Sequence, residues 1–195
     1  MPRIAKNQNV QRNEIMNACV VLYNEKGLKF TMDDISKYCH ISKKTMYLLF
    51  DDKEDLFLDM VDFVFDHVKE SEKKVIEDNS LSTVEKIRKV LGVLPEGYTE
   101  IDFAELYLLK EKYPKIYEQL EERLETGWET TIALIEKGQE EGVIKKNIHV
   151  PLVKMMFESS LEKFFQRDVL KKNKISYKAA LDEVVNIIVD GIVAK

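Results

Sequence analysis

The sequence is poor in cysteine, with two among 195 residues, Cys19 and Cys39. Both fall on apolar faces of predicted helices. Two thiols in a reducing compartment are most simply explained as small buried apolar side chains. We therefore expect neither a disulfide nor a metal site from them.

Long hydrophobic runs are also missing. The first 14 residues, MPRIAKNQNVQRNE, contain no apolar segment of signal-peptide length, and apolar runs elsewhere are only a few residues long. We expect a cytoplasmic protein with no membrane partner. Its composition, 45% apolar and 33% charged, is ordinary for a globular protein with a substantial core.

Recognisable catalytic motifs are absent as well. The chain has no glycine-rich phosphate loop, no GxSxG and no HExxH, and its three histidines, His40, His67 and His149, are widely separated. A pair of carboxylates in a cleft would leave no such signature, but nothing in the sequence singles one out. We expect no catalytic residue, no metal and no cofactor.

Charge is distributed unevenly along the chain. Residues 1–50 hold eight Lys or Arg against four Asp or Glu, a balance of +4, whereas the whole chain carries −5 and the remainder therefore −9. An acidic protein can bind nucleic acid when its positive charge is gathered at one end. The asymmetry points to the N-terminal end as the nucleic-acid-binding end.

Residues 31–53, TMDDISKYCHISKKTMYLLFDDK, contain signals for three helix starts and one tight turn. Thr31 and Asp34 can form a capping box, which predicts a helix beginning at Thr31. Ser42 is a second N-cap, so the turn falls at Cys39 to Ile41. Two short helices joined in this way form a helix-turn-helix motif, whose second helix can enter the DNA major groove.

Basic residues stand where a helix ordinarily prefers acids. Lys43 and Lys44 lie in the first turn of the second helix, and Lys53 lies in the first turn of the third. Cations at a helix N-terminus oppose the macrodipole, so stability alone does not account for them. DNA phosphates would favour both the lysines and the free N–H groups. Each lysine taken singly is equally compatible with a solvated surface.

Residues 15–56 resemble the N-terminal DNA-binding domain of the TetR family of bacterial transcriptional regulators. The matching positions lie at fixed spacings across all three helices: Ile15, Ala18, Leu22, Gly27, Thr31, Ile35, Ile41, Ser42, Thr45, Tyr47, Phe50, Lys53 and Leu56. The chain departs from the family pattern at His40, Lys44 and Leu49. His40 would have to adopt the left-handed conformation in the turn, and the family's operators are a poor guide to base preference.

The resemblance implies an all-α fold of about nine helices in two parts. Residues 8–68 would form the helix-turn-helix DNA-binding domain, with the motif at about 31–50, and residues 69–195 a helical ligand-binding and dimerisation core. Such a protein would be a homodimeric repressor that binds a palindromic double-stranded DNA operator and is released by a small-molecule effector. Activation of transcription through the same DNA contacts is the alternative sign of regulation. The competing hypothesis is a helical protein–protein adaptor that keeps the motif only for packing.

The expected DNA contacts all lie at the helix starts or on the second helix of the motif. They are Thr31, Ser42, Lys43, Lys44, Thr45, Tyr47 and Lys53. Lys44 and Thr45 are the candidates for base edges, and the phosphates would be held by Thr31, Lys43, Tyr47 and Lys53, which set the register. Tyr47 has a second interpretation, as a core aromatic.

The remaining helices are predicted from apolar periodicity and from breaks at Gly, Pro, Ser and Asn. We expect a polar arm to about residue 9 and a helix from there to residue 26. The helix starting near residue 52 should fray over 70–79. Further helices are expected at about 83–94, 101–111, 114–141, 151–170 and 177–193.

The last helix carries an unusually wide apolar face, formed by Leu181, Val184, Val185, Ile188 and Ile192. A terminal helix with this much apolar surface suggests a two-fold interface, in which a helix pair from each subunit forms a four-helix bundle. Complete burial of this face within one monomer is the alternative.

A ligand cavity in the C-terminal core would be lined by aromatic and aliphatic side chains. The candidates are Tyr98, Phe103, Tyr107, Trp128, Met156, Phe157 and Phe164. Aromatic residues at helical spacing also serve as plain core. An effector bound there would have to prefer the conformation that does not fit the operator, because only differential affinity shifts an equilibrium.

Overall fold

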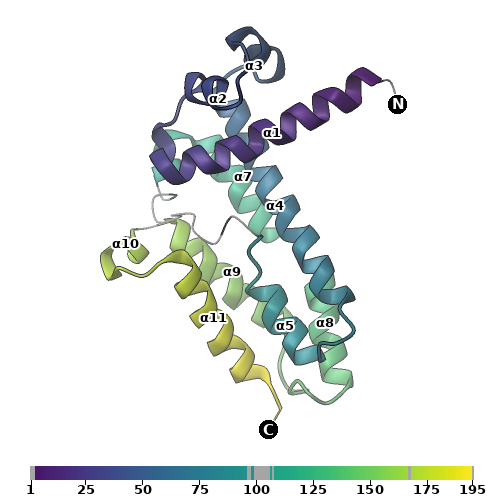
Figure 1. Ribbon diagram of the computed structural model, residues 1–195. Helices are drawn as coiled ribbons and strands as arrows, with labels where there is room; N and C mark the ends of the chain where they lie inside the picture. The colour runs from purple at the N-terminus through teal and green to yellow at the C-terminus, as the bar shows by residue number, and fades with distance from the viewer. Residues whose placement is uncertain (1–2, 96–97, 99–105, 107, 167, 195) are drawn as a thin grey trace.

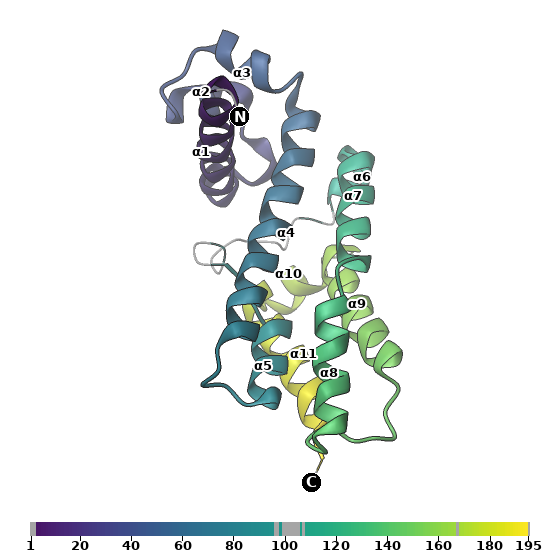
Figure 2. The same ribbon diagram turned by 90° about the vertical axis from the view of Figure 1, so that its right-hand side faces the viewer.

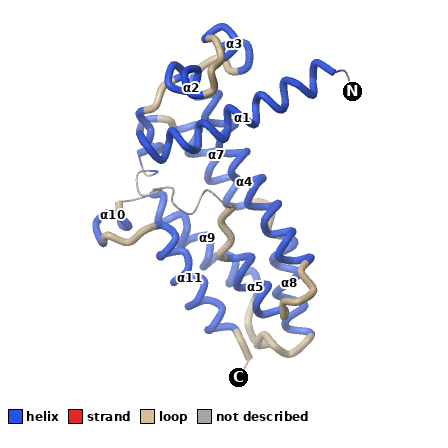
Figure 3. The backbone as a smooth tube through the Cα atoms, viewed as in Figure 1, coloured by secondary structure: helices blue, strands red, loops and turns tan. Residues whose placement is uncertain are grey.

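The computed structural model describes residues 3–95, 98, 106, 108–166 and 168–194. Over these residues the chain forms α-helices and 3-10 segments, among them the short 3-10 helix Gly27–Lys29, with no strand (Figure 3). An isolated β-bridge joins Ile144 and Val193. The predicted all-α fold is confirmed. No helix in the described part of the chain has the length and apolar character needed to cross a membrane.

The first three helices lie together at one end of the molecule (Figure 1). They are α1 (Arg3–Lys26), α2 (Met32–Tyr38) and α3 (Lys43–Leu49). The capping box predicted for α2 is present, since the Thr31 N–H donates to Asp34 over 2.8 Å and the Asp34 N–H donates to the Thr31 hydroxyl over 3.2 Å.

The N-terminal arm predicted to reach about residue 9 is wrong, because α1 already begins at Arg3. The polar composition of this segment suggested a loop, but no proline or glycine interrupts it after residue 2, and a helix that has started elongates readily.

Helix α4 (Lys53–Glu77) runs from the N-terminal helices down into the rest of the molecule (Figure 2). Its N-cap is Asp52, whose side chain accepts a hydrogen bond from the Asp55 N–H. The predicted fraying over 70–79 is wrong. The last turns remain helical, and ion pairs at helical spacing join Lys69 to Glu72 and Lys73 to Glu77.

Within its described residues, the C-terminal part contains seven further α-helices. They are α5 (Thr83–Leu91), α6 (Leu109–Lys112), α7 (Pro114–Glu125), α8 (Glu129–Glu140), α9 (Val150–Gln166), α10 (Val169–Asn173) and α11 (Tyr177–Ile192). α5 packs against α4, α8 and α11, while α9 packs against α7, α8 and α11. The helices predicted at 83–94 and 151–170 end earlier, at Leu91 and Gln166. Much of the segment predicted at 101–111 lies outside the described residues.

The single helix predicted over 114–141 is wrong, because the chain breaks between α7 and α8. Gly127 takes φ +75°, a left-handed value that favours glycine. The indole N–H of Trp128 donates to the Leu124 carbonyl over 2.7 Å, which satisfies an otherwise free oxygen at the end of α7. Both features depend on local conformations that the apolar periodicity does not reveal.

Gly138 of α8 packs closely against the side chain of Ile144, in the segment that follows α8, and lies beside Ile87 of α5. A Cβ atom added there would lie 2.6 Å from Cγ1 of Ile144 and 3.5 Å from Cδ1 of Ile87. By contrast, a Cβ atom added at Gly191 in α11 would meet nothing within 4 Å.

We predict opposite effects for two glycine-to-alanine substitutions. Gly138→Ala should lower the free energy of unfolding by about 1–3 kcal/mol, because the added methyl group overlaps the Ile144 side chain. Gly191→Ala should raise it by up to about 1 kcal/mol, because alanine is the better helix former. Urea unfolding followed by circular dichroism measures both. A change of the same sign for the two variants would contradict the packing described here.

Candidate nucleic-acid interface and ligand cavity

The turn between α2 and α3 adopts the conformation predicted for it. His40 lies in the left-handed region, with φ 53°. The Ile41 N–H donates to the Ser36 carbonyl over 3.0 Å, and the Cys39 N–H donates to the Ile35 carbonyl over 2.9 Å. These bonds fix the direction in which α3 leaves α2.

Helix α3 is held to the core by one face and exposes the other. Met46 and Phe50 are buried, whereas Tyr47 is 55% exposed and Leu48 is 76% exposed. The alternative interpretation of Tyr47 as a core aromatic is therefore wrong. Lys44 is also exposed, and it lies three and four residues before Tyr47 and Leu48, so the three side chains share one helix face.

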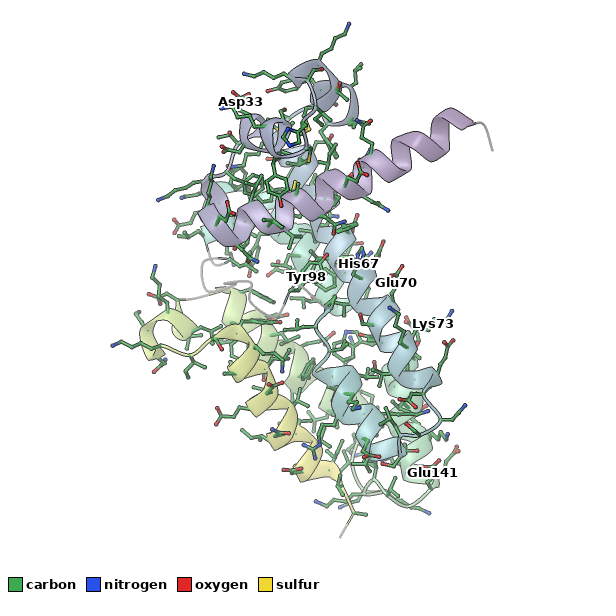
Figure 4. The ribbon with its side chains drawn as sticks, viewed as in Figure 1. Asp33, His67, Glu70, Lys73, Tyr98 and Glu141 are labelled. Atoms are coloured by element: carbon green, nitrogen blue, oxygen red, sulfur yellow. The ribbon has the colours of Figure 1, made fainter. Side chains whose placement is uncertain are left out.

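The other motif residues occupy the starts of α2 and α3. The Ser42 side chain accepts from the Thr45 N–H over 3.1 Å, which makes Ser42 the N-cap of α3. The Lys43 ammonium lies 2.6 Å from Asp33 of α2, at the end of the molecule marked by Asp33 in Figure 4. This contact raises the pKa of Lys43. Thr31 is exposed and takes part in the capping box.

Lys53 lies apart from this face. Its ammonium donates to the Leu28 carbonyl over 2.7 Å and lies 5.1, 5.2 and 5.9 Å from the ring centroids of Phe30, Phe57 and Tyr113. Burial lowers its pKa. Through these contacts Lys53 links the 3-10 helix, α4 and the start of α7.

Two exposed residues of the motif were missed from sequence, Tyr38 and Leu48. Tyr38 stands three residues after the buried Ile35, a spacing typical of one apolar helix face, yet it is 49% exposed. Leu48 precedes the half-buried Leu49, and two adjacent leucines on a short helix cannot both face the core. Helices as short as α2 and α3 have too few turns for the apolar periodicity to show which side chains face the core and which face solvent.

The C-terminal core contains an elongated cavity of about 180 Å³. One wall is α4, from Phe57 to Glu72; at 1.5 Å per residue this wall is roughly 22 Å long. The cavity extends to Tyr23 and Leu28 of the N-terminal helices. Its lining is mostly apolar, with side chains from α4 to α9 and from α11, and its polar members are Lys69, Glu72, Arg123, Thr126 and Thr131.

One end of the α4 wall is polar. The Lys69 ammonium donates to both carboxylate oxygens of Glu72, over 2.9 and 3.1 Å, and to the Gly127 carbonyl over 2.7 Å. Glu72 is buried, and burial raises its pKa despite the Lys69 contact. This contact also ties α4 to the break between α7 and α8.

Of the seven predicted ligand-binding residues, Trp128 and Phe157 line the cavity, with ring centroids 5.7 Å apart. Tyr98 is buried beside His67, 6.2 Å between centroids (Figure 4), and Phe164 packs on Tyr177; neither Tyr98 nor Phe164 belongs to the lining. Met156 is 55% exposed. Phe103 and Tyr107 lie outside the residues whose side chains are described.

The apolar face of α11 that was predicted to form the dimer interface packs against other helices of the same chain. Leu181, Val185, Ile188 and Ile192 are buried against the chain's own helices, and Val184 is half-buried. The alternative of burial within one monomer describes these side chains better, because α5 and α9 already cover this side of α11. The described residues expose another apolar set nearby: Leu152, Met155 and Met156 on α9 and Ile187 on α11.

Comparison with known proteins identifies the N-terminal part. The family described as "Bacterial regulatory proteins, tetR family" matches residues 15–60, which span the end of α1, the motif and the start of α4. These residues belong to the TetR family. The chain is 25% identical over 173 residues to the uncharacterised HTH-type transcriptional regulator YvaF of Bacillus subtilis (strain 168), covering 89% of this chain and 90% of that protein. It is a TetR-type transcriptional regulator.

Solved structures of TetR-family regulators share the fold. A regulator from Haloarcula marismortui superposes with a TM-score of 0.71 at 16% identity, covering 95% of this chain and 100% of that one. The regulator FadR from Bacillus subtilis, solved in complex with stearoyl-CoA, superposes with a TM-score of 0.60 at 20% identity, covering 92% and 98%. At such identities the likeness concerns the fold alone.

Salt dependence should separate the roles of two lysines in this TetR-family motif. Each phosphate contact contributes about 0.9 to the slope of log affinity against log salt concentration. Lys43→Met should reduce the slope by about 0.9 per half-site. Lys53→Met should leave it unchanged, because Lys53 is engaged with Leu28 and three rings.

The measurement is fluorescence anisotropy of labelled DNA at several salt concentrations. Lys146→Met, at an exposed position far from the motif in sequence, is the control and should behave as wild type. An equal loss of slope in Lys43→Met and Lys53→Met would show that Lys53 leaves its internal partners to hold a phosphate.

Proposed function

We propose that the protein is a homodimeric repressor that binds an inverted-repeat DNA operator through α2 and α3. We further propose that a small molecule in the cavity beside α4 releases it. The observation that carries the proposal is the exposed face of α3, where Lys44, Tyr47 and Leu48 point away from the core while Met46 and Phe50 anchor the helix.

On this proposal the residues of the motif have separate roles. Lys44 and Thr45 would reach base edges, while Thr31, Ser42, Lys43 and Tyr47 would hold the phosphate backbone and set the register of α3 in the groove. Lys53 would reach a phosphate only after breaking its bond to Leu28. The balance of +4 over residues 1–50 favours approach of this end to DNA. A protein with this role would work in the cytoplasm.

The dimer would form through the outer faces of α9 and α11. Leu152, Met155 and Met156 are spaced by three and four residues, so they form one stripe on α9, and each is about half exposed. α9 packs against α11 (Figure 1), which contributes Ile187, 67% exposed. Two such helix pairs meeting about a two-fold axis would form a four-helix bundle.

The effector would be an elongated, largely apolar molecule. The cavity has a long apolar wall along α4 and a polar end at Lys69 and Glu72. FadR from Bacillus subtilis, which shares the fold, was solved with stearoyl-CoA, so this arrangement of helices can accommodate a long-chain ligand. Residues 8–68 would form the DNA-binding domain and residues 69–195 the effector and dimer domain, with α4 crossing the boundary.

Selection of bound sequences from a random double-stranded DNA pool tests the proposal. Wild type should enrich one inverted repeat, whose half-sites lie about one helical turn of DNA apart. The double variant Met155→Glu, Ile187→Glu should be monomeric, because charges replace the apolar interface, and should enrich at most single half-sites.

Light scattering measures the molecular mass of both proteins, and Val143→Glu provides a control charge at a 36% exposed apolar position outside the proposed interface. A folded wild-type dimer that enriches no sequence would favour the adaptor hypothesis. A double variant that stays dimeric would contradict the proposed interface.

A further inference from the structure

Leu48 has the highest exposure, 76%, among the large apolar side chains of the described residues. The folding of α3 does not require it. Met46 and Phe50 anchor the helix with exposures of 0% and 1%, and Leu49 is half-buried beside them. A polar residue at position 48 would satisfy the same fold with less apolar surface in water.

The neighbours of Leu48 indicate what it would contact. Lys44 lies one helical turn before it and Tyr47 immediately before it, and all three are exposed on one face. The lysine and the tyrosine hydroxyl suit a polyanion, and Leu48 adds an apolar group to this DNA-facing surface. It is therefore placed to meet an apolar group within a charged and polar partner.

The major groove offers one such group. Base pairs present hydrogen-bond donors and acceptors there, and thymine alone adds a methyl group, at C5. We propose that Leu48 packs against the 5-methyl group of a thymine in each operator half-site and so specifies that base. The inference rests on the proposed entry of α3 into the major groove.

The position of this thymine follows from helix geometry. Four residues of α3 advance roughly 6 Å at 1.5 Å per residue, and base pairs are spaced by about 3.4 Å. The thymine should therefore lie within about two base pairs of the base that Lys44 contacts. Because lysine pairs best with O6 and N7 of guanine, we expect a guanine at that second position.

Replacing thymine by uracil removes the methyl group and leaves base pairing intact. In the duplex obtained by selection, each thymine is replaced singly by deoxyuridine, and affinity is measured by anisotropy. One position per half-site should lose about fourfold in affinity, the factor expected when one methyl group leaves an apolar contact. Replacement at the other positions should change affinity little.

The variant Leu48→Ala should bind the thymine and uracil duplexes with nearly equal affinity. Val21→Ala, which truncates a 37% exposed apolar residue of α1, should keep the fourfold preference. Circular dichroism and dimer mass confirm that each variant is folded.

Three results would overturn the inference. An enriched operator that tolerates uracil at every position would refute it while leaving the proposed function intact. Retention of the thymine preference by Leu48→Ala would refute the assignment to this residue. Failure to enrich any sequence would refute both the inference and the proposed base reading.

Discussion

Helix α4 packs on both the N-terminal and the C-terminal helices within one continuous hydrophobic core, and the rest of the structure depends on this constraint. Its first turns pack on the N-terminal helices, where the rings of Phe57 and Phe30 lie 5.1 Å apart. Its later turns, to Glu72, form a wall of the cavity. Because a helix resists bending, a displacement of either half is transmitted to the other.

Helix α7 reinforces this arrangement along most of its length. Lys115 pairs with Glu54 over 2.8 Å, the Gln119 amide donates to the Leu58 carbonyl over 3.2 Å, and Arg123 pairs with Asp66 over 2.6 Å. The contacts of α7 recur every four residues, so one face of α7 follows α4. A molecule that separates α4 from α7 would have to disturb this series of contacts. Lys53, the first residue of α4, lies at the end of the series nearest the N-terminal helices.

Local signals predicted the motif well, whereas tertiary packing was harder to predict. Thr31 and Ser42 each cap a helix by accepting a hydrogen bond from a backbone N–H three residues further along, so they predict where α2 and α3 begin. The chain must turn between these two helices, and His40 adopts the left-handed conformation in that turn. The side of α11 that faces inward depends on α5 and α9, which are distant in sequence. Its apolar face therefore indicated burial correctly but could not distinguish the chain's own core from a partner.

The cavity shows the same limit. Trp128 and Phe157 were predicted as ligand-binding residues and do line it, whereas the rest of its wall comes from residues on several helices that periodicity presents as ordinary core. The break at Gly127 that brings its carbonyl to Lys69 depends on a single left-handed residue. Neither feature has a sequence signature of its own.

Filling the cavity by mutation tests the central role of α4 without knowledge of the effector. Val64 lines the cavity from the middle of α4, and Val64→Phe adds a ring inside it. Operator affinity of this variant, compared with Val143→Phe outside the cavity, is the decisive measurement. Coupling through α4 predicts at least about fivefold weaker binding by a folded dimer. Unchanged affinity in a variant whose cavity is filled would contradict it.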